Sequence, residues 1–151
     1  MGVQADEARG RPAAENEEAL RVAAKAGQTA EVRVLLAAGT DPDAAGGGDT
    51  ALDKATGRGH DAAVGALAEG GADLDKADNY GSTPLMVAAL NGHSSVMRKL
   101  LELGADHTAV GTGWCEGKTA LTLAEEAGKE EAAAVLREWA ATVPPDGGAD
   151  E

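Results

Sequence analysis

The sequence predicts an all-α solenoid of four stacked helix–turn–helix units, joined by hairpin-like connectors. One observation is a pattern that recurs along most of the chain. Another is the composition, because 151 residues include 21 Gly and no Phe. Short helices that end at Gly and pack closely through Ala, Leu and Val fit this composition, whereas a single core of large aromatic side chains does not.

The recurring pattern opens each unit with a Thr-x-Leu tripeptide. It is found at Thr50-Ala51-Leu52, at Thr83-Pro84-Leu85 and at Thr119-Ala120-Leu121, with spacings of 33 and 36 residues. An earlier copy opens at Glu18-Ala19-Leu20, 32 residues before the first of these. A fixed period of roughly 20 to 50 residues is typical of repeat proteins, in which each unit buries its apolar face on its neighbours.

The copy that begins at Thr83 shows how one unit is expected to fold. Thr83 is suited to cap a helix, and Pro84 to occupy its first turn. Apolar residues follow at helical spacing until Gly92, after which a second helix runs to Gly104. Because helices of about ten residues are marginal alone, each pair must be stabilised by the adjacent pairs.

Three short motifs carry a resemblance to a known family. They are Thr83-Pro84-Leu85-Met86, Gly92-His93 and Gly71-Ala72-Asp73-Leu74-Asp75. In these motifs the chain resembles the ankyrin repeats, whose pattern is Thr-Pro-Leu-His, then Gly-His, then Gly-Ala-Asp-Val-Asn. The resemblance covers residues 15–141. It implies a stack of helix pairs that binds other proteins, with Asp73 and Asp106 making loop hydrogen bonds between units.

The departures from the family pattern predict where the stack is weak. Asp53, Met86 and Thr122 stand where the family has His, so we do not expect the hydrogen bonds that this His makes between loops. The unit that starts at Thr50 has a Gly inside its first helix, at Gly57, which costs about 1 kcal/mol against Ala. We therefore expect this unit to be the softest. His60 and His93 recur with the repeat and are expected to cap and pack the second helices.

Charge and cysteine content limit the function classes. The formal net charge is −13, which disfavours binding to nucleic acids or to an anionic membrane surface. The expected partner is a protein with a basic or mixed-charge surface. One cysteine, Cys115, allows no disulfide within the chain, which fits the cytoplasm, with the nucleus as the alternative. We expect a monomer with a flexible segment 1–14, the repeat domain 15–141 and a disordered acidic tail 142–151.

A catalytic function is the competing hypothesis. Residues 112–119 nearly spell a phosphate-binding loop, but Thr112 stands where that motif needs Gly. His107 and Cys115 are too few for a zinc site and lack a third group for nucleophilic catalysis. We therefore expect no catalytic residues, cofactor or metal. The alternatives are an inhibitor of a kinase-like enzyme, or a nucleotide-binding or thiol enzyme that uses the loop 111–119.

The expected partner-binding residues lie on the connectors and on the exposed ends of the first helices. The connector that contains residues 111–117 is three residues longer than the preceding one and bears Trp114, so this insertion is expected to project and to bind. Tyr80 and Leu90 are expected to extend an exposed apolar strip from Trp114. The full set is Asp53, Arg58, Asp78, Asn79, Tyr80, Ser82, Leu90, Asn91, Trp114, Glu116 and Lys118.

Overall fold

The computed structural model describes residues 8–142, and within them the helices form four consecutive pairs. The pairs are α2 (Ala13–Ala26) with α3 (Thr29–Ala37), α4 (Ala51–Arg58) with α5 (Asp61–Glu69), α6 (Pro84–Asn91) with α7 (Ser94–Glu102), and α8 (Ala120–Glu126) with α9 (Glu130–Thr142). In place of strands, the described residues contain two isolated β-bridges. The expected all-α stack of four helix pairs is confirmed.

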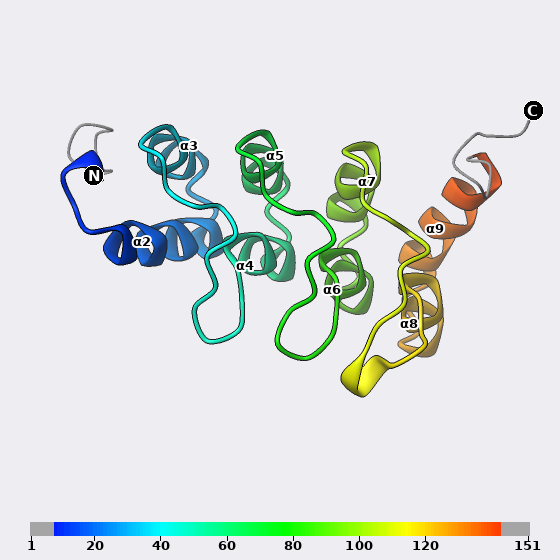
Figure 1. Ribbon diagram of the computed structural model, residues 1–151. Coiled ribbons are helices and arrows are strands. Elements are labelled where there is room, and N and C mark those ends of the chain that lie inside the picture. The colour runs from blue at the N-terminus through cyan, green and yellow to red at the C-terminus, as the bar shows by residue number, and fades with distance from the viewer. Residues whose placement is uncertain (1–7, 143–151) are drawn as a thin grey trace, which may run out of the picture.

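The helices lie in two rows that run along the stack (Figure 1). Helices α2, α4, α6 and α8 contact one another in sequence and form what we call the inner row. Helices α3, α5, α7 and α9 form the outer row in the same way. Between successive pairs, three connectors extend beyond the inner row: residues 38–50, 70–83 and 103–119. The connectors and the inner row thus share one side of the molecule.

The same local signals start and stop the helices in successive repeats. The hydroxyl oxygens of Thr50, Thr83 and Thr119 accept hydrogen bonds from the backbone N–H three residues on, at 3.2 to 3.3 Å. These bonds satisfy N–H groups that a helix start leaves unpaired. Gly59 and Gly92 end α4 and α6 in the left-handed region, at φ 77° and 72°. The sequence therefore places both ends of α4 and α6 correctly.

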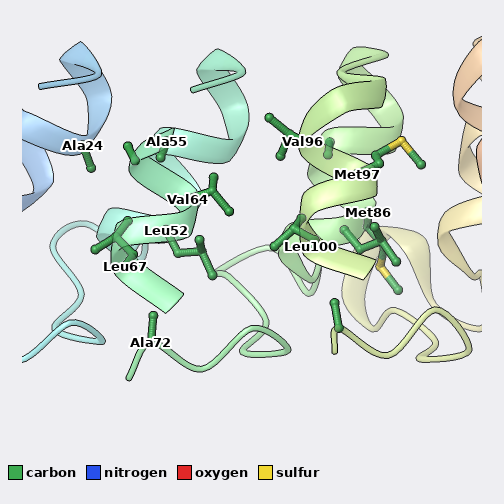
Figure 2. Close-up of a cluster of buried hydrophobic side chains, with 14 of the residues drawn as sticks. Ala24, Leu52, Ala55, Val64, Leu67, Ala72, Met86, Val96, Met97 and Leu100 are labelled. Carbon is green, nitrogen blue, oxygen red and sulfur yellow. The ribbon is translucent and has the colours of Figure 1, made fainter. Parts of the chain in front are cut away.

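The core lies between the two rows and is built from small and aliphatic side chains (Figure 2). Leu52 and Ala55 of α4 face Val64 and Leu67 of α5, and all four are at most 1% exposed. Burial of a Leu or Val side chain contributes about 1.5 to 3 kcal/mol. Because the inner helices bring alanines to their contacts, neighbouring repeats approach closely without large aromatic residues.

The second and third repeats are each joined to the preceding repeat by a histidine. The His60 Nε2 donates to the backbone carbonyl of Lys25 at 3.1 Å, and the His93 Nε2 donates to that of Gly57 at 3.1 Å. Neither side chain bonds to the N–H groups of its own helix start. His60 and His93 occupy the N-cap positions of α5 and α7, as expected, but they make no capping bond, because the imidazoles reach the end of the preceding inner helix instead.

Aspartates link the connectors to one another. The Asp43 carboxylate accepts from the backbone N–H of Asp73 at 2.9 Å, and the Asp75 carboxylate accepts from that of Asp106 at 2.8 Å. Asp73 and Asp106 therefore take part in the predicted bonds between units through their backbone. Their own carboxylates accept instead from residues of the same turn.

The N-terminal segment differs from the expected flexible tail where it is described. Helix α2 begins at Ala13, and Ala8 is completely buried. The Asn16 amide donates to the Ala8 carbonyl, which holds this segment against the first repeat. At the other end, α9 includes Thr142, the first residue of the expected acidic tail. Residues 1–7 and 143–151 lie outside the described part, so the domain limits stay a prediction.

Candidate functional site

The residues expected to bind a partner divide by their exposure. The exposed ones are Arg58, Asn79, Tyr80, Asn91, Trp114 and Glu116, the half-buried ones are Asp78, Leu90 and Lys118, and the buried ones are Asp53 and Ser82. Three expectations need correction. Leu90 packs against the core, so it is not part of an exposed strip. Asp53 and Ser82 are 7% and 2% exposed, so neither is the exposed contact that was expected.

The third connector is anchored to the second. It contains a 3₁₀ turn, η1 (Gly113–Cys115), and the backbone N–H of Thr112 donates to the Gly81 carbonyl at 3.0 Å. The Trp114 indole N–H donates to the Ser82 hydroxyl at 3.1 Å. The insertion does not project freely as expected, because both bonds fix it to its neighbour. Ser82 acts by holding Trp114 rather than by touching a partner.

Two aromatic side chains are nevertheless exposed on these joined connectors. Tyr80 is 64% exposed and Trp114 is 55% exposed. We call them the connector aromatics. Val110, 58% exposed, adds an apolar residue of the third connector that the sequence analysis missed. Its position in an extended, aperiodic segment gave no sign of which way the side chain would face.

Cys115 fills the joint between the connectors. It has no exposed surface, and its Sγ lies 3.4 Å from the carbonyl oxygen of Thr112 and 3.7 Å from the Ser82 hydroxyl. Reactive cysteines are partly exposed and lie in electropositive surroundings. Cys115 therefore lacks the features of a nucleophile. The loop 111–119 also lacks the strand that precedes a phosphate-binding loop, since an isolated bridge at Gly111 stands there.

A groove opens on the inner row beside α4, with a volume of about 320 Å³. We call it the α4 groove. Its lining residues come from α2, α4, α6 and the first two connectors: Lys25, Asp49, Asp53, Lys54, Gly57, Arg58, Asp78 and Val87. Asp53, Arg58 and Asp78 were expected separately as contact residues, and the structure brings them together in this groove. Lys25 and Lys54 were not expected, because their spacing follows no motif.

The carboxylate of Asp53 lies at the wall of the α4 groove. Its Oδ2 accepts from the backbone N–H and the hydroxyl of Thr50, at 3.0 and 3.2 Å, while its Oδ1 is buried without a partner among the described residues. The pKa of Asp53 is raised from 3.8 to about 6, mainly because burial disfavours the charged form. The Thr50 bonds lower the pKa, and the negative charges of Asp49 and Asp78 raise it.

Within residues 8–142, no group of three or more His, Cys, Asp or Glu side chains is placed to hold a metal ion. None of the helices in this range is long and apolar enough to cross a membrane. The connector aromatics and the α4 groove lie on the side of the molecule that the connectors and the inner row share.

A family model for ankyrin repeats in three copies matches residues 20–111 and again 74–144. The two matches span all four helix pairs. The chain belongs to the ankyrin-repeat family. Members of this family generally mediate protein–protein interaction and are typically not enzymes.

Proposed function

We propose that the protein is a non-catalytic interaction module, which binds a partner protein through its inner row and connectors. The observation that carries the proposal is the pair of exposed connector aromatics on two joined connectors. Tyr and Trp are enriched among the residues that contribute most to protein interfaces. Since the third connector is anchored and its indole N–H is already bonded to Ser82, Trp114 loses little conformational freedom on binding.

Charge supports a partner with a basic or mixed-charge surface. The chain carries a net charge of −13, and acidic residues flank the aromatics on the connectors: Asp75, Asp78, Asp106 and Glu116. Opposite charge on a partner would speed its association with this chain. The negative charge of the chain itself disfavours nucleic acids and anionic membranes as partners. We further propose a monomer of the cytoplasm or nucleus, in keeping with its single buried thiol.

The decisive experiment compares the connector aromatics with a third aromatic residue. Partner proteins are first captured with the wild-type chain and identified, and their affinities for variants are then measured. Trp114→Ala should weaken binding by more than about tenfold, because a truncated interface Trp typically loses at least about 2 kcal/mol. The melting temperature should change little, because the ring makes one hydrogen bond and is mostly exposed.

Trp139→Ala is the matched control. This tryptophan lies on α9, half-buried against the core, so its loss should lower the melting temperature and leave the affinity of the folded protein unchanged. If Trp114→Ala instead lowers the melting temperature as much as Trp139→Ala and binding is unaffected, the connectors are structural and the proposal fails. Nucleotides should leave the melting temperature unchanged in all three proteins.

A further inference from the structure

We propose that the α4 groove receives an arginine side chain from the partner protein. This inference rests on the proposed interaction function and specifies the chemistry of one contact. It is carried by two observations: a buried carboxylate oxygen without a partner on Asp53, which lines the groove, and the space that Gly57 leaves on the same helix.

The space in the groove comes from a glycine on an inner helix. Gly57 lies in the last turn of α4, and a methyl group added there would meet only the Val87 Cγ1, at 3.9 Å. In the next repeat the equivalent position is Leu90, which packs against the core. The second repeat therefore leaves open a space that the third repeat fills. A flat guanidinium group could lie against Val87 and the backbone of α4 there.

Asp53 completes a capping box with Thr50 at the start of α4, whereas α6 and α8 start without a carboxylate at this position. The hydroxyls of Thr83 and Thr119 cap α6 and α8 with Met86 and Thr122 at the position equivalent to Asp53. A buried carboxylate oxygen without a partner costs free energy, because it has lost water and gained no bond. A donor supplied by a ligand would remove that cost. The groove is thus incomplete in the free protein at the Asp53 Oδ1.

The charges around the groove are arranged by depth. Asp53 is buried, Asp49 and Asp78 are half-buried, and Lys54 is held by Asp49 at 3.3 Å. Lys25 and Arg58 are exposed at the rim. A cation that enters the groove from solvent can therefore reach the carboxylates, while the exposed charges at the rim are screened by salt. An acidic residue beside the arginine could face this rim, so a mixed-charge segment fits better than a purely basic one.

Arginine suits this site better than lysine. Its planar fork presents five donors and forms paired bonds with carboxylates, whereas an ammonium group is a compact charge that keeps its water more firmly. Asp53 offers one oxygen, and the bonds within the second connector use the Oδ1 of Asp78 and leave its Oδ2 available. Each of two residues that line the groove therefore has an oxygen available to the donors of a guanidinium group.

The test is a titration of the full-length chain with N-acetyl-arginine N-methylamide, monitored by ¹H–¹⁵N NMR. We expect saturable shifts, in the millimolar range, for the amides of Gly57, Arg58 and Asp78. N-acetyl-citrulline N-methylamide, which has the same shape without the charge, should produce none, and the lysine analogue should bind more weakly. Asp53→Asn should weaken arginine binding by about tenfold, the typical effect of losing a charge-assisted hydrogen bond.

Two further variants keep the test decisive if Asp53→Asn alters the fold. Gly57→Leu fills the groove as Leu90 does in the third repeat and should abolish the arginine shifts. Glu102→Gln removes an exposed carboxylate at the end of α7 and should leave them unchanged. The inference is overturned if no shift saturates, if citrulline acts like arginine, or if Gly57→Leu still binds.

Failure of this inference is distinguishable from failure of the proposed function. Trp114→Ala should lose the captured partner but retain the arginine shifts, because Trp114 does not line the groove. If partner binding depends on Trp114 while the arginine titration is silent, the groove assignment is wrong and the interaction function stands. If arginine binds but the connector variants retain the partner at full affinity, the function proposed for the connectors is wrong.

Discussion

The second and third repeats share the same framework but use two equivalent positions in opposite ways. Both begin with a threonine cap, end the inner helix at a left-handed glycine and join the preceding repeat through a histidine. The third repeat has Met86 and Leu90 where the second has Asp53 and Gly57. Met86 is 1% exposed, and Leu90 packs against the core. Met86 and Leu90 thus fill the part of the surface that Asp53 and Gly57 leave open in the second repeat.

This difference shows how a repeat protein can assign stability and recognition to different units. The stability of a stack is approximately the sum of local and nearest-neighbour contributions. A repeat that gives up buried apolar area can therefore be supported by its neighbours. The α4 groove opens beside such a repeat, and the third repeat fills the equivalent positions with Met86 and Leu90. The variants below exchange the features of the two repeats or measure them side by side.

The largest effect is expected when the third repeat is given the polar residue of the second. Met86→Asp should lower the free energy of unfolding by about 2 to 4 kcal/mol at pH 7, because it removes a buried apolar side chain and buries a charge. Thr83 could bond to the new carboxylate as Thr50 does to Asp53, so the helix start should survive. Urea unfolding measures the change.

Met86→Leu is the matched control, since it keeps the apolar volume and should cost less than about 1.5 kcal/mol. If both variants unfold at the same urea concentration, the buried apolar side chain at position 86 does not contribute to the free energy of unfolding. The difference between the two repeats would then have no effect on stability.

The next effect is a dependence on pH that belongs to the second repeat. Because the pKa of Asp53 is raised from 3.8 to about 6, the folded state binds this proton more tightly than the unfolded state. The contribution of Asp53 therefore increases stability as pH falls from 7 through 6 towards 4, and the cost of the ionised form is fully present above pH 6. Asp53→Asn should remove up to about 3 kcal/mol of this dependence.

The measurement is the difference in unfolding free energy between wild type and Asp53→Asn at a series of pH values. Taking the difference cancels the other carboxylates and the histidines. Asp49 and Asp78 raise the Asp53 pKa, and Lys25, Lys54 and Arg58 are the cations that line the same groove. A difference that stays constant between pH 4 and 7 would show that the Asp53 pKa is not raised.

The repeat architecture could be predicted from the sequence because its signals are local. Thr50, Thr83 and Thr119 set the helix starts, and the glycines that follow set the ends, so periodicity alone gave four pairs. The α4 groove could not be predicted in the same way, because its lining comes from three inner helices and two connectors. Asp53 was selected as an exposed contact, yet it is 7% exposed.

Trp114 illustrates the same limit. Its exposure was expected from the glycines around it, and the structure agrees. Its bond to Ser82 and the burial of Cys115 depend on how the second and third connectors lie together, which residue spacing does not specify. Local conformation is encoded nearby in the chain, whereas contacts between repeats depend on the packing of the whole stack.

Amide hydrogen exchange should show a smaller difference between the two repeats. The backbone amides of residues 50–59 are expected to exchange about tenfold faster than those of residues 83–92, because Gly57 and the unpartnered Asp53 oxygen weaken α4. Native-state exchange followed by NMR compares the two segments within one sample. Equal or slower exchange in residues 50–59 would show that the second repeat is not the softest.

The smallest effect is expected at Gly57, where the helix itself can be strengthened. Gly57→Ala should raise the free energy of unfolding by about 0.5 to 1 kcal/mol, since Ala has the higher helix propensity. The position is helical and roomy, because the added methyl group would lie 3.9 Å from the nearest Val87 carbon, an ordinary contact. Thermal and urea unfolding together measure a gain of this size.

Gly59→Ala is the opposing control two residues along. Gly59 has φ 77°, where a side chain is strained, and an added methyl group would lie 3.1 Å from the His93 imidazole. That variant should therefore lose stability and weaken the bond from His93 to the Gly57 carbonyl. If Gly57→Ala also destabilises the protein, then the glycine is required by the packing of α4 against α6, and an open groove would no longer explain why the second repeat has it.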